Sequence, residues 1–110
     1  MLPLNQVEVR DYVDQSGTRP FTKWFDALGV KAAAKVATAV TRLSLGNYSN
    51  VKGVGAGVFE YKIDFGPGYR IYFAKEGESL IILLGGGVKK RQRQDIQKAI
   101  ANWMDYKRRK

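Results

Sequence analysis

The stretch FEYKIDFGPGYRIYF, residues 59–73, constrains the fold most, because its side chains alternate in character along two runs that flank a Gly-Pro-Gly turn. Such alternation around a glycine-rich turn predicts an antiparallel β-hairpin. The odd positions carry apolar and aromatic residues on one face: Phe59, Tyr61, Ile63, Phe65, Tyr69, Ile71 and Phe73. If the turn is a tight three-residue loop, the expected opposite pairs are Phe65 with Tyr69, Asp64 with Arg70, Ile63 with Ile71, Lys62 with Tyr72 and Tyr61 with Phe73.

The other face of this hairpin carries the even positions, which are Glu60, Lys62, Asp64, Arg70 and Tyr72. A sheet with one solvated face normally carries polar residues there, and a cross-strand pair of Asp64 with Arg70 needs no function. The same residues also suit a site that binds an anion. The hairpin pattern by itself leaves both interpretations open.

Hydrophobic periodicity predicts the remaining elements. Alternation favours a strand at residues 7–13, and the continuous apolar run 79–84 is typical of a central strand covered on both faces. The 3.6-residue period predicts helices over 20–28, 30–45 and about 91–106, whereas the composition of 47–57 is typical of a loop. The order strand-helix-helix-strand-strand-strand-helix predicts an α+β domain with helices packed on a small, twisted, mainly antiparallel sheet. The expected core includes Trp24, Phe25, Ile63, Ile71, Ile82, Ile96 and Ile100.

The composition restricts the chemistry of the chain. We expect one domain over residues 1–110, with a basic tail at about 104–110. There is no cysteine, which excludes disulfides and thiolate metal sites, and no histidine, which removes the usual general base and the commonest metal ligand. No metal and no cofactor are therefore expected. The longest apolar run, residues 80–88, is too short to span a bilayer, and with no secretory signal at the start we expect a cytoplasmic protein.

The charge of the chain points to a polyanionic partner. Nineteen Lys and Arg residues against ten Asp and Glu give a net charge of +9. Four of the cations, Lys89, Lys90, Arg91 and Arg93, lie where the last predicted helix begins. Cations at a helix N-terminus oppose the helix dipole, so a bound phosphate would relieve an unfavourable arrangement.

Several motifs together resemble one known group of proteins. GPGYR (66–70), the apolar strand that ends in LLGGG (83–87) and the QRQDI sequence that opens the last helix are similar to the C-terminal half of toxins of the RelE/ParE superfamily. Upstream, FTKWFDAL (21–28) and RLSLGN (42–47) extend the resemblance over nearly the whole chain, with the HigB-like branch, or addiction-module killer proteins, the most similar. The resemblance implies a RelE-like fold and a toxin of a type II toxin–antitoxin system.

This resemblance also implies partners and an activity. RelE-like members cleave messenger RNA on the ribosome, whereas ParE-like members poison DNA gyrase without being nucleases. A third possibility is a nucleic-acid-binding module in which the cations only hold phosphates. The expected partners are the ribosome, mRNA and a neighbouring antitoxin that carries a helix-turn-helix, with acidic antitoxin residues near Lys62, Arg70 or Lys90.

The nuclease branch places its catalytic residues at positions that match Lys62, Arg70 and Arg91 here. Two departures are Asp64, where RelE has a second lysine, and Gln97, where it has a tyrosine. Because arginine holds phosphate oxygens but cannot act as a base, we assign Arg70 and Arg91 to charge stabilisation and Lys62 to the general base. The residues expected to contact substrate are Tyr72, which would position a group or stack on a base, Lys89, Lys90, Arg93 and Asp64, which would act as a base or hold Arg70.

Overall fold

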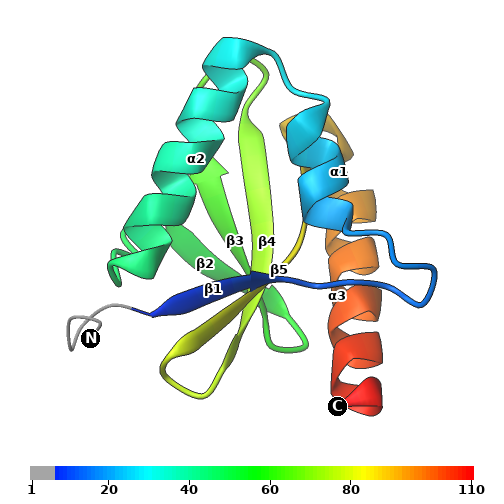
Figure 1. The fold of residues 1–110 in the computed structure, drawn as a ribbon. Helices are drawn as coiled ribbons and strands as arrows, with labels where there is room; N and C mark the ends of the chain where they lie inside the picture. The colour runs from blue at the N-terminus through cyan, green and yellow to red at the C-terminus, as the bar shows by residue number, and fades with distance from the viewer. Residues whose placement is uncertain (1–6) are drawn as a thin grey trace.

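The computed structural model describes residues 7–110 and shows a five-stranded sheet with helices on both faces (Figure 1). The α+β fold class predicted from the sequence is confirmed. In chain order the elements are β1 (Glu8–Asp11), α1 (Pro20–Asp26), α2 (Val30–Ser44), β2 (Val51–Gly55), β3 (Val58–Ile63), β4 (Tyr69–Glu76), β5 (Leu80–Val88), the 3-10 turn η1 (Lys89–Arg91) and α3 (Gln92–Arg109).

The sheet has the strand order β1-β5-β4-β3-β2, with β1 parallel to β5 and the other neighbours antiparallel. One face packs against α1 and α2, around Phe21, Val36 and Leu43. The other face packs against α3, around Ala99 and Trp103. The sheet is therefore the middle of three layers, and Figure 1 shows the strands lying between α2 and α3.

Two strand predictions were incomplete. Residues 51–55, expected in a loop, form β2, whose backbone pairs with β3 although its glycines give no apolar alternation. The last strand, expected to end at residue 84, continues to Val88 because the three glycines keep pairing with β4, Gly87 opposite Arg70 and Gly85 opposite Tyr72. Backbone hydrogen bonding of this kind leaves no side-chain pattern in a sequence.

The predicted register of the hairpin was wrong by two residues. Ile63 lies opposite Tyr69, Lys62 opposite Arg70 and Tyr61 opposite Ile71. The turn is wider than expected because Gly66 and Gly68 both adopt positive φ, at 55° and 80°, and Asp64 and Phe65 leave the ladder. A shift of two keeps every side chain on its predicted face, since strand side chains alternate with a period of two.

Three of the five even-face residues of the hairpin are buried, so the expectation of a solvated face was wrong for Glu60, Arg70 and Tyr72 and holds only for Lys62 and Asp64. Side chains on this face contact α3, and Glu60, Arg70 and Tyr72 expose only 1%, 4% and 1% of their surface. The reason is that α3 must bury its own apolar stripe, which includes Trp103, and the even face of β3, β4 and β5 is the surface available to it.

The predicted core is confirmed in part. Ile63, Ile71 and Ile82 are buried as expected. The other four predicted residues pack against the core but stay half-exposed, because each lies at the edge of a helix–sheet contact: Trp24, Phe25, Ile96 and Ile100.

The three glycines of β5 have different surroundings, which leads to a prediction. A Cβ on Gly86 would lie 2.2 Å from the ring of Trp24, whereas a Cβ on Gly85 would meet nothing within 4 Å. We expect Gly86→Ala to lower the free energy of unfolding by about 1–3 kcal/mol, because the indole ring must move. Gly85→Ala is the matched control and should be neutral or slightly stabilising. Urea unfolding of both variants tests this, and equal stabilities would contradict the packing described here.

Candidate functional site: a basic surface over a buried arginine

The predicted residues Lys62 and Arg70 lie side by side in one row across the sheet. Lys62 on β3 is opposite Arg70 on β4, which in turn is opposite Gly87 on β5. A Cβ on Gly87 would lie 1.9 Å from an Asp95 carboxylate oxygen, so the first turn of α3 lies directly on this row. Directly opposite residues share a face, with Cβ atoms about 5 Å apart.

Arg70 is buried and forms an ion pair with a buried glutamate. Its Nε lies 3.5 Å from Glu60 Oε1, and its Nη1 donates a hydrogen bond to Tyr69 O at 3.2 Å. The second oxygen of Glu60 accepts a hydrogen bond of 2.7 Å from Gln92 Nε2, at the start of α3. The Glu60 carboxylate thus connects β3 and β4 with the helix that covers them.

Only a thin layer separates the Arg70 guanidinium from the surface. Arg70 Nη1 lies 3.3 Å from the position that a Cβ on Gly68 would occupy, and Gly68 is half-exposed. The Gly68 carbonyl accepts a hydrogen bond of 2.7 Å from the Lys89 N–H, and this bond joins the hairpin turn to η1. The absence of a side chain at Gly68 therefore leaves the positive charge of Arg70 close to the molecular surface.

Tyr72 is buried, so the expectation that it faces solvent was wrong and its ring cannot stack on a base in this conformation. Its hydroxyl makes no hydrogen bond with any of residues 7–110. Burial, followed by the negative charges of Glu60 and Asp95, raises the pKa of Tyr72 well above its ordinary value. Tyr72 is therefore a neutral phenol at physiological pH.

The remaining predicted site residues are exposed. Lys62 pairs with Asp64, at 3.7 Å between Nζ and Oδ1, and their side chains are 54% and 84% exposed. Asp64 therefore contacts Lys62 and not Arg70, so its expected role of holding Arg70 was wrong. The register explains this, because Asp64 lies beyond the end of the ladder. The cations around the start of α3 are also exposed: Lys89, Lys90, Arg91 and Arg93.

Arg91 influences the row of Lys62, Arg70 and Gly87 only through its neighbours on α3. It directly precedes Gln92, whose amide contacts Glu60, and its positive charge acts on Asp95. Burial nevertheless raises the pKa of Asp95 above its ordinary value, and the charges of Lys98 and Arg91 oppose this shift. Gln97, at the position where RelE has a tyrosine, is exposed.

Sequence reasoning missed Glu60, Gln92 and Asp95 as parts of this arrangement. Glu60 has the even spacing of Lys62 and Arg70, but only the docking of α3 buries it against Arg70. Gln92 and Asp95 lie three residues apart in the first turn of α3, a spacing that puts both on the side facing the sheet. That spacing is the signal available in the sequence.

Residues 104–110 were expected to form a basic tail. Instead, α3 continues through them to Arg109, and side-chain hydrogen bonds join this last part of α3 to Tyr12, which follows β1. Tyr12 donates a hydrogen bond of 2.5 Å to Asp105 Oδ2, and Arg109 Nε donates one of 2.9 Å to the same oxygen. Buried Asp105 thus supplies the acid that fixes this basic segment.

This anchor predicts a loss of stability in acid. The hydrogen bond from Tyr12, followed by that from Arg109, lowers the pKa of Asp105 to about 2. Because the pKa of an unfolded aspartate is about 3.9, the stabilisation is complete above that pH and is lost as the pH falls toward about 2. We expect the difference in melting temperature between the wild type and Asp105→Asn to shrink from pH 5 to pH 2. Asp64→Asn, at an exposed carboxylate, is the control; an unchanged difference for Asp105→Asn would contradict the anchor.

Two further findings concern residues 7–110 alone. No cluster of three acidic residues there has the geometry of a metal-binding site. None of α1, α2 and α3 is both long and apolar enough to cross a bilayer.

Comparisons with known proteins place the chain in a family. Residues 23–103 match a family described as Phage derived protein Gp49-like (DUF891). An uncharacterised protein of Haemophilus influenzae is 41% identical over 83 residues, which cover 74% of this chain and 84% of that protein. The matched region runs from α1 to Trp103 in α3, and so includes the buried Arg70 and the exposed cations around it, Lys62, Lys89, Lys90, Arg91 and Arg93. The chain therefore belongs to the Gp49-like family, a family of type II toxin–antitoxin toxins related to the RelE-like toxins.

Proposed function

We propose that this protein is a HigB-like endoribonuclease that cleaves ribosome-bound mRNA without a metal ion and so arrests translation. The observation that carries the proposal is the arrangement of cations around Gly68. Lys62 is exposed directly opposite Arg70, whose buried guanidinium lies just beneath Gly68, and Lys89 is bonded to Gly68 through its backbone. A phosphate near this glycine would meet positive charge from several directions.

The proposed reaction uses the RNA's own 2′-hydroxyl as the nucleophile. The 2′-oxygen attacks the adjacent phosphorus, the bond from phosphorus to the 5′-oxygen breaks, and a 2′,3′-cyclic phosphate and a 5′-hydroxyl form. The nucleophile gives up one proton and the leaving 5′-oxygen takes up one proton, so the reaction needs no co-reactant. Charge grows on the phosphate oxygens as the new bond forms, and fixed cations stabilise that charge.

The cations divide into two groups by exposure. Lys62 and Arg91 are exposed and can touch the RNA directly, Lys62 as the base for the 2′-hydroxyl and Arg91 as a bidentate phosphate ligand. Arg70 acts from beneath Gly68 through its charge, which Glu60 balances in part and which water screens poorly at this buried position. The exposed Lys89, Lys90 and Arg93 hold the flanking phosphates.

Asp64 has a role that depends on Lys62. Its carboxylate lies 3.7 Å from Lys62 Nζ and so holds that amine beside the end of the hairpin ladder. RNA that enters the site would repel Asp64 and loosen this exposed pair, which has little intrinsic strength. Asp64 is then either the orienting partner of Lys62 or an alternative base for the 2′-hydroxyl.

Membership of a toxin–antitoxin family implies an antitoxin as partner. We propose a helix-turn-helix antitoxin encoded beside this protein. Its acidic residues would contact the exposed cations near Lys62 and Lys90, because this face is strongly basic and a toxin of this class must be neutralised in the cell that makes it.

The test is a comparison of RNA and DNA damage in the same cells. On brief induction we expect new mRNA 5′ ends that lie within translated frames, carry a 5′-hydroxyl and vanish when translation initiation is blocked. Plasmid supercoiling should stay unchanged over the same period. Relaxed plasmids with intact mRNA would instead indicate a gyrase poison, and growth arrest with neither change would indicate a binding module.

A further inference from the structure

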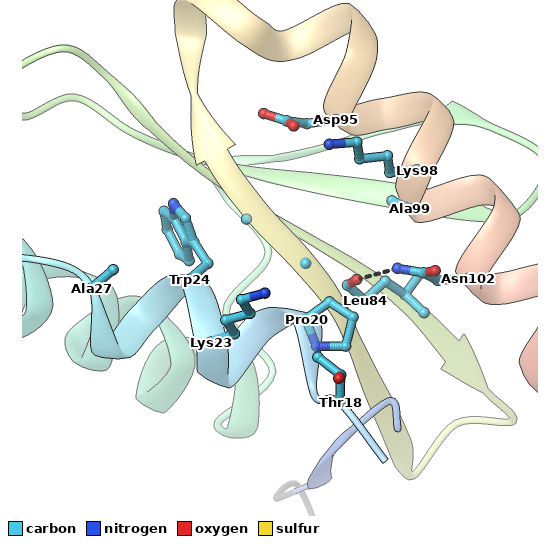
Figure 2. Close-up of a pocket in the computed structure, with 12 residues that line it drawn as sticks. Thr18, Pro20, Lys23, Trp24, Ala27, Leu84, Asp95, Lys98, Ala99 and Asn102 are labelled. Atoms are coloured by element: carbon cyan, nitrogen blue, oxygen red, sulfur yellow. Dashed lines mark hydrogen bonds between the residues drawn. The ribbon is translucent and has the colours of Figure 1, made fainter. Parts of the chain in front are cut away.

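A slot runs between α1 and α3 along the last part of β5 (Figure 2). It has a volume of about 470 Å³. Lys23 and Trp24 of α1 form one wall, and Lys98 and Asn102 of α3 form the other. Leu84, Gly85 and Gly86 of β5 line the floor between them. The slot borders the candidate site at Asp95, but none of the exposed cations of that site lines it: Lys62, Lys89, Lys90, Arg91 and Arg93.

The floor of this slot is the free edge of a β-sheet. β1 pairs only with Leu80–Leu83, so from Leu84 onward β5 has a neighbouring strand on the β4 side alone. Because Lys89 N–H bonds toward Gly68 on that side, the alternation of an antiparallel ladder directs the N–H and C=O of Gly86 to the open side. Within residues 7–110, the hydrogen bond that reaches this edge comes from Asn102 Nδ2 to Leu84 O, at 2.9 Å.

The walls decide what can pair with this edge. Since α1 and α3 flank this edge, the two helices would obstruct a second sheet, and the slot between them suits a single extended segment. Glycine at position 85 keeps the slot open, because a Cβ there would point into empty space. In an added strand, successive side chains would point to the α1 wall and the α3 wall in turn.

The charges of the walls favour an acidic segment. Lys23 and Lys98 are exposed, one on each wall, and the whole chain carries +9. Asp95 also lines the slot, but its carboxylate packs against Gly87. The positive charge of Lys98, three residues later on α3, offsets the negative charge of Asp95. Nucleic acid is also anionic, but it has no repeating amides to match the free N–H and C=O groups of a strand edge.

We propose that the slot binds an extended, acidic segment of a partner protein, which adds as a sixth strand to the free edge of β5 at Leu84–Gly86. Backbone hydrogen bonds supply the part of the affinity that does not depend on the sequence of the segment. Two neighbouring acidic residues, one facing Lys23 and the next facing Lys98, supply the selectivity. The inference does not depend on ribonuclease activity, so the two proposals succeed or fail separately.

The experiment titrates ¹⁵N-labelled protein with an acetylated peptide of about eight residues, with valine and threonine around a central Glu-Glu pair. We expect shifts centred on the amides of Leu84–Gly86 and slowed hydrogen exchange at the Gly86 N–H. Replacing Glu-Glu with Lys-Lys should weaken binding by about tenfold or more, and the double variant Lys23→Glu, Lys98→Glu should reverse this preference. Gly85→Val should abolish binding by filling the slot, with Gly29→Ala, at an exposed glycine, as the control.

Three results would overturn the proposal. The first is no shift at Leu84–Gly86 with about 5 mM peptide, since even a millimolar complex would be detected. The second is equal binding by a peptide whose alternate amides are N-methylated, because that change removes the bonds to the edge. The third is a shift of the same amides by an RNA hexamer and not by the peptide, which would assign the slot to nucleic acid.

Discussion

Arg70→Ala is expected to lower the free energy of unfolding by about 3 kcal/mol or more, because the buried Glu60 carboxylate then keeps only the neutral Gln92 amide and the exposed Lys52, at 3.8 Å, as partners. Glu60 is 1% exposed and Arg70 is 4% exposed, with 3.5 Å between the charged atoms. An arginine on a solvated strand, as the sequence pattern suggested, would cost about 0.5 kcal/mol or less. Urea unfolding, followed by circular dichroism, separates the two values clearly.

A double variant identifies the cause of this loss. Glu60→Gln removes the partner charge while keeping its shape, so the pair Glu60→Gln, Arg70→Met should be more stable than Arg70→Ala alone. If Arg70→Ala unfolds like the wild type, the ion pair of Arg70 with Glu60 makes no net contribution to stability. Loss of RNA cleavage in Arg70→Ala is informative only at a temperature where that variant is folded.

Lys62→Ala is expected to reduce RNA cleavage by about a hundredfold while leaving stability unchanged, because it removes the proposed base from an exposed position. The side chain is 54% exposed and its ion pair with Asp64 is solvent-exposed, so truncation should change the free energy of unfolding by about 0.5 kcal/mol or less. The measurement is the rate of cleavage of mRNA in a translating extract, together with the melting temperature of the variant.

A second lysine provides the matched control for this variant. Lys31→Ala makes the same change of charge at an exposed position on α2, away from the row formed by Lys62, Arg70 and Gly87. It should keep the wild-type rate. If both variants cleave at the same reduced rate, total charge governs the activity; if both keep the wild-type rate, Lys62 is not the base.

The sequence by itself determined the fold class and the faces of the central hairpin. Alternation with a period of two assigned Tyr61, Ile63, Ile71 and Phe73 to the face that packs on α1 and α2, and this assignment is confirmed. It held although the register was wrong, because a shift of two residues does not exchange the faces. The 3.6-residue period likewise predicted all three helices, since each must present an apolar stripe to the sheet.

The predicted site residues Lys62, Arg70 and Arg91 were chosen by resemblance, and their catalytic roles stay a proposal. The sequence did place Lys62 and Arg70 on one face of the hairpin, where the structure has them directly opposite one another. The sequence could not reveal Glu60 as the partner of Arg70. A carboxylate on the polar face of a strand is predicted to be solvated, and only the docking of α3 shows that Glu60 is buried.

Only the tertiary structure decided which polar residues are inside. The even face has the pattern of a solvated surface, and it became a second core because α3 folds back over β3, β4 and β5. That docking buries Glu60, Arg70 and Tyr72, and it leaves Lys62 and the cations of η1 exposed around them. The free edge of β5 was also decided only by the tertiary structure. It exists because β1 ends at Asp11, whereas β5 continues to Val88. Local periodicity reports the face of a residue, but burial depends on which distant element reaches that face.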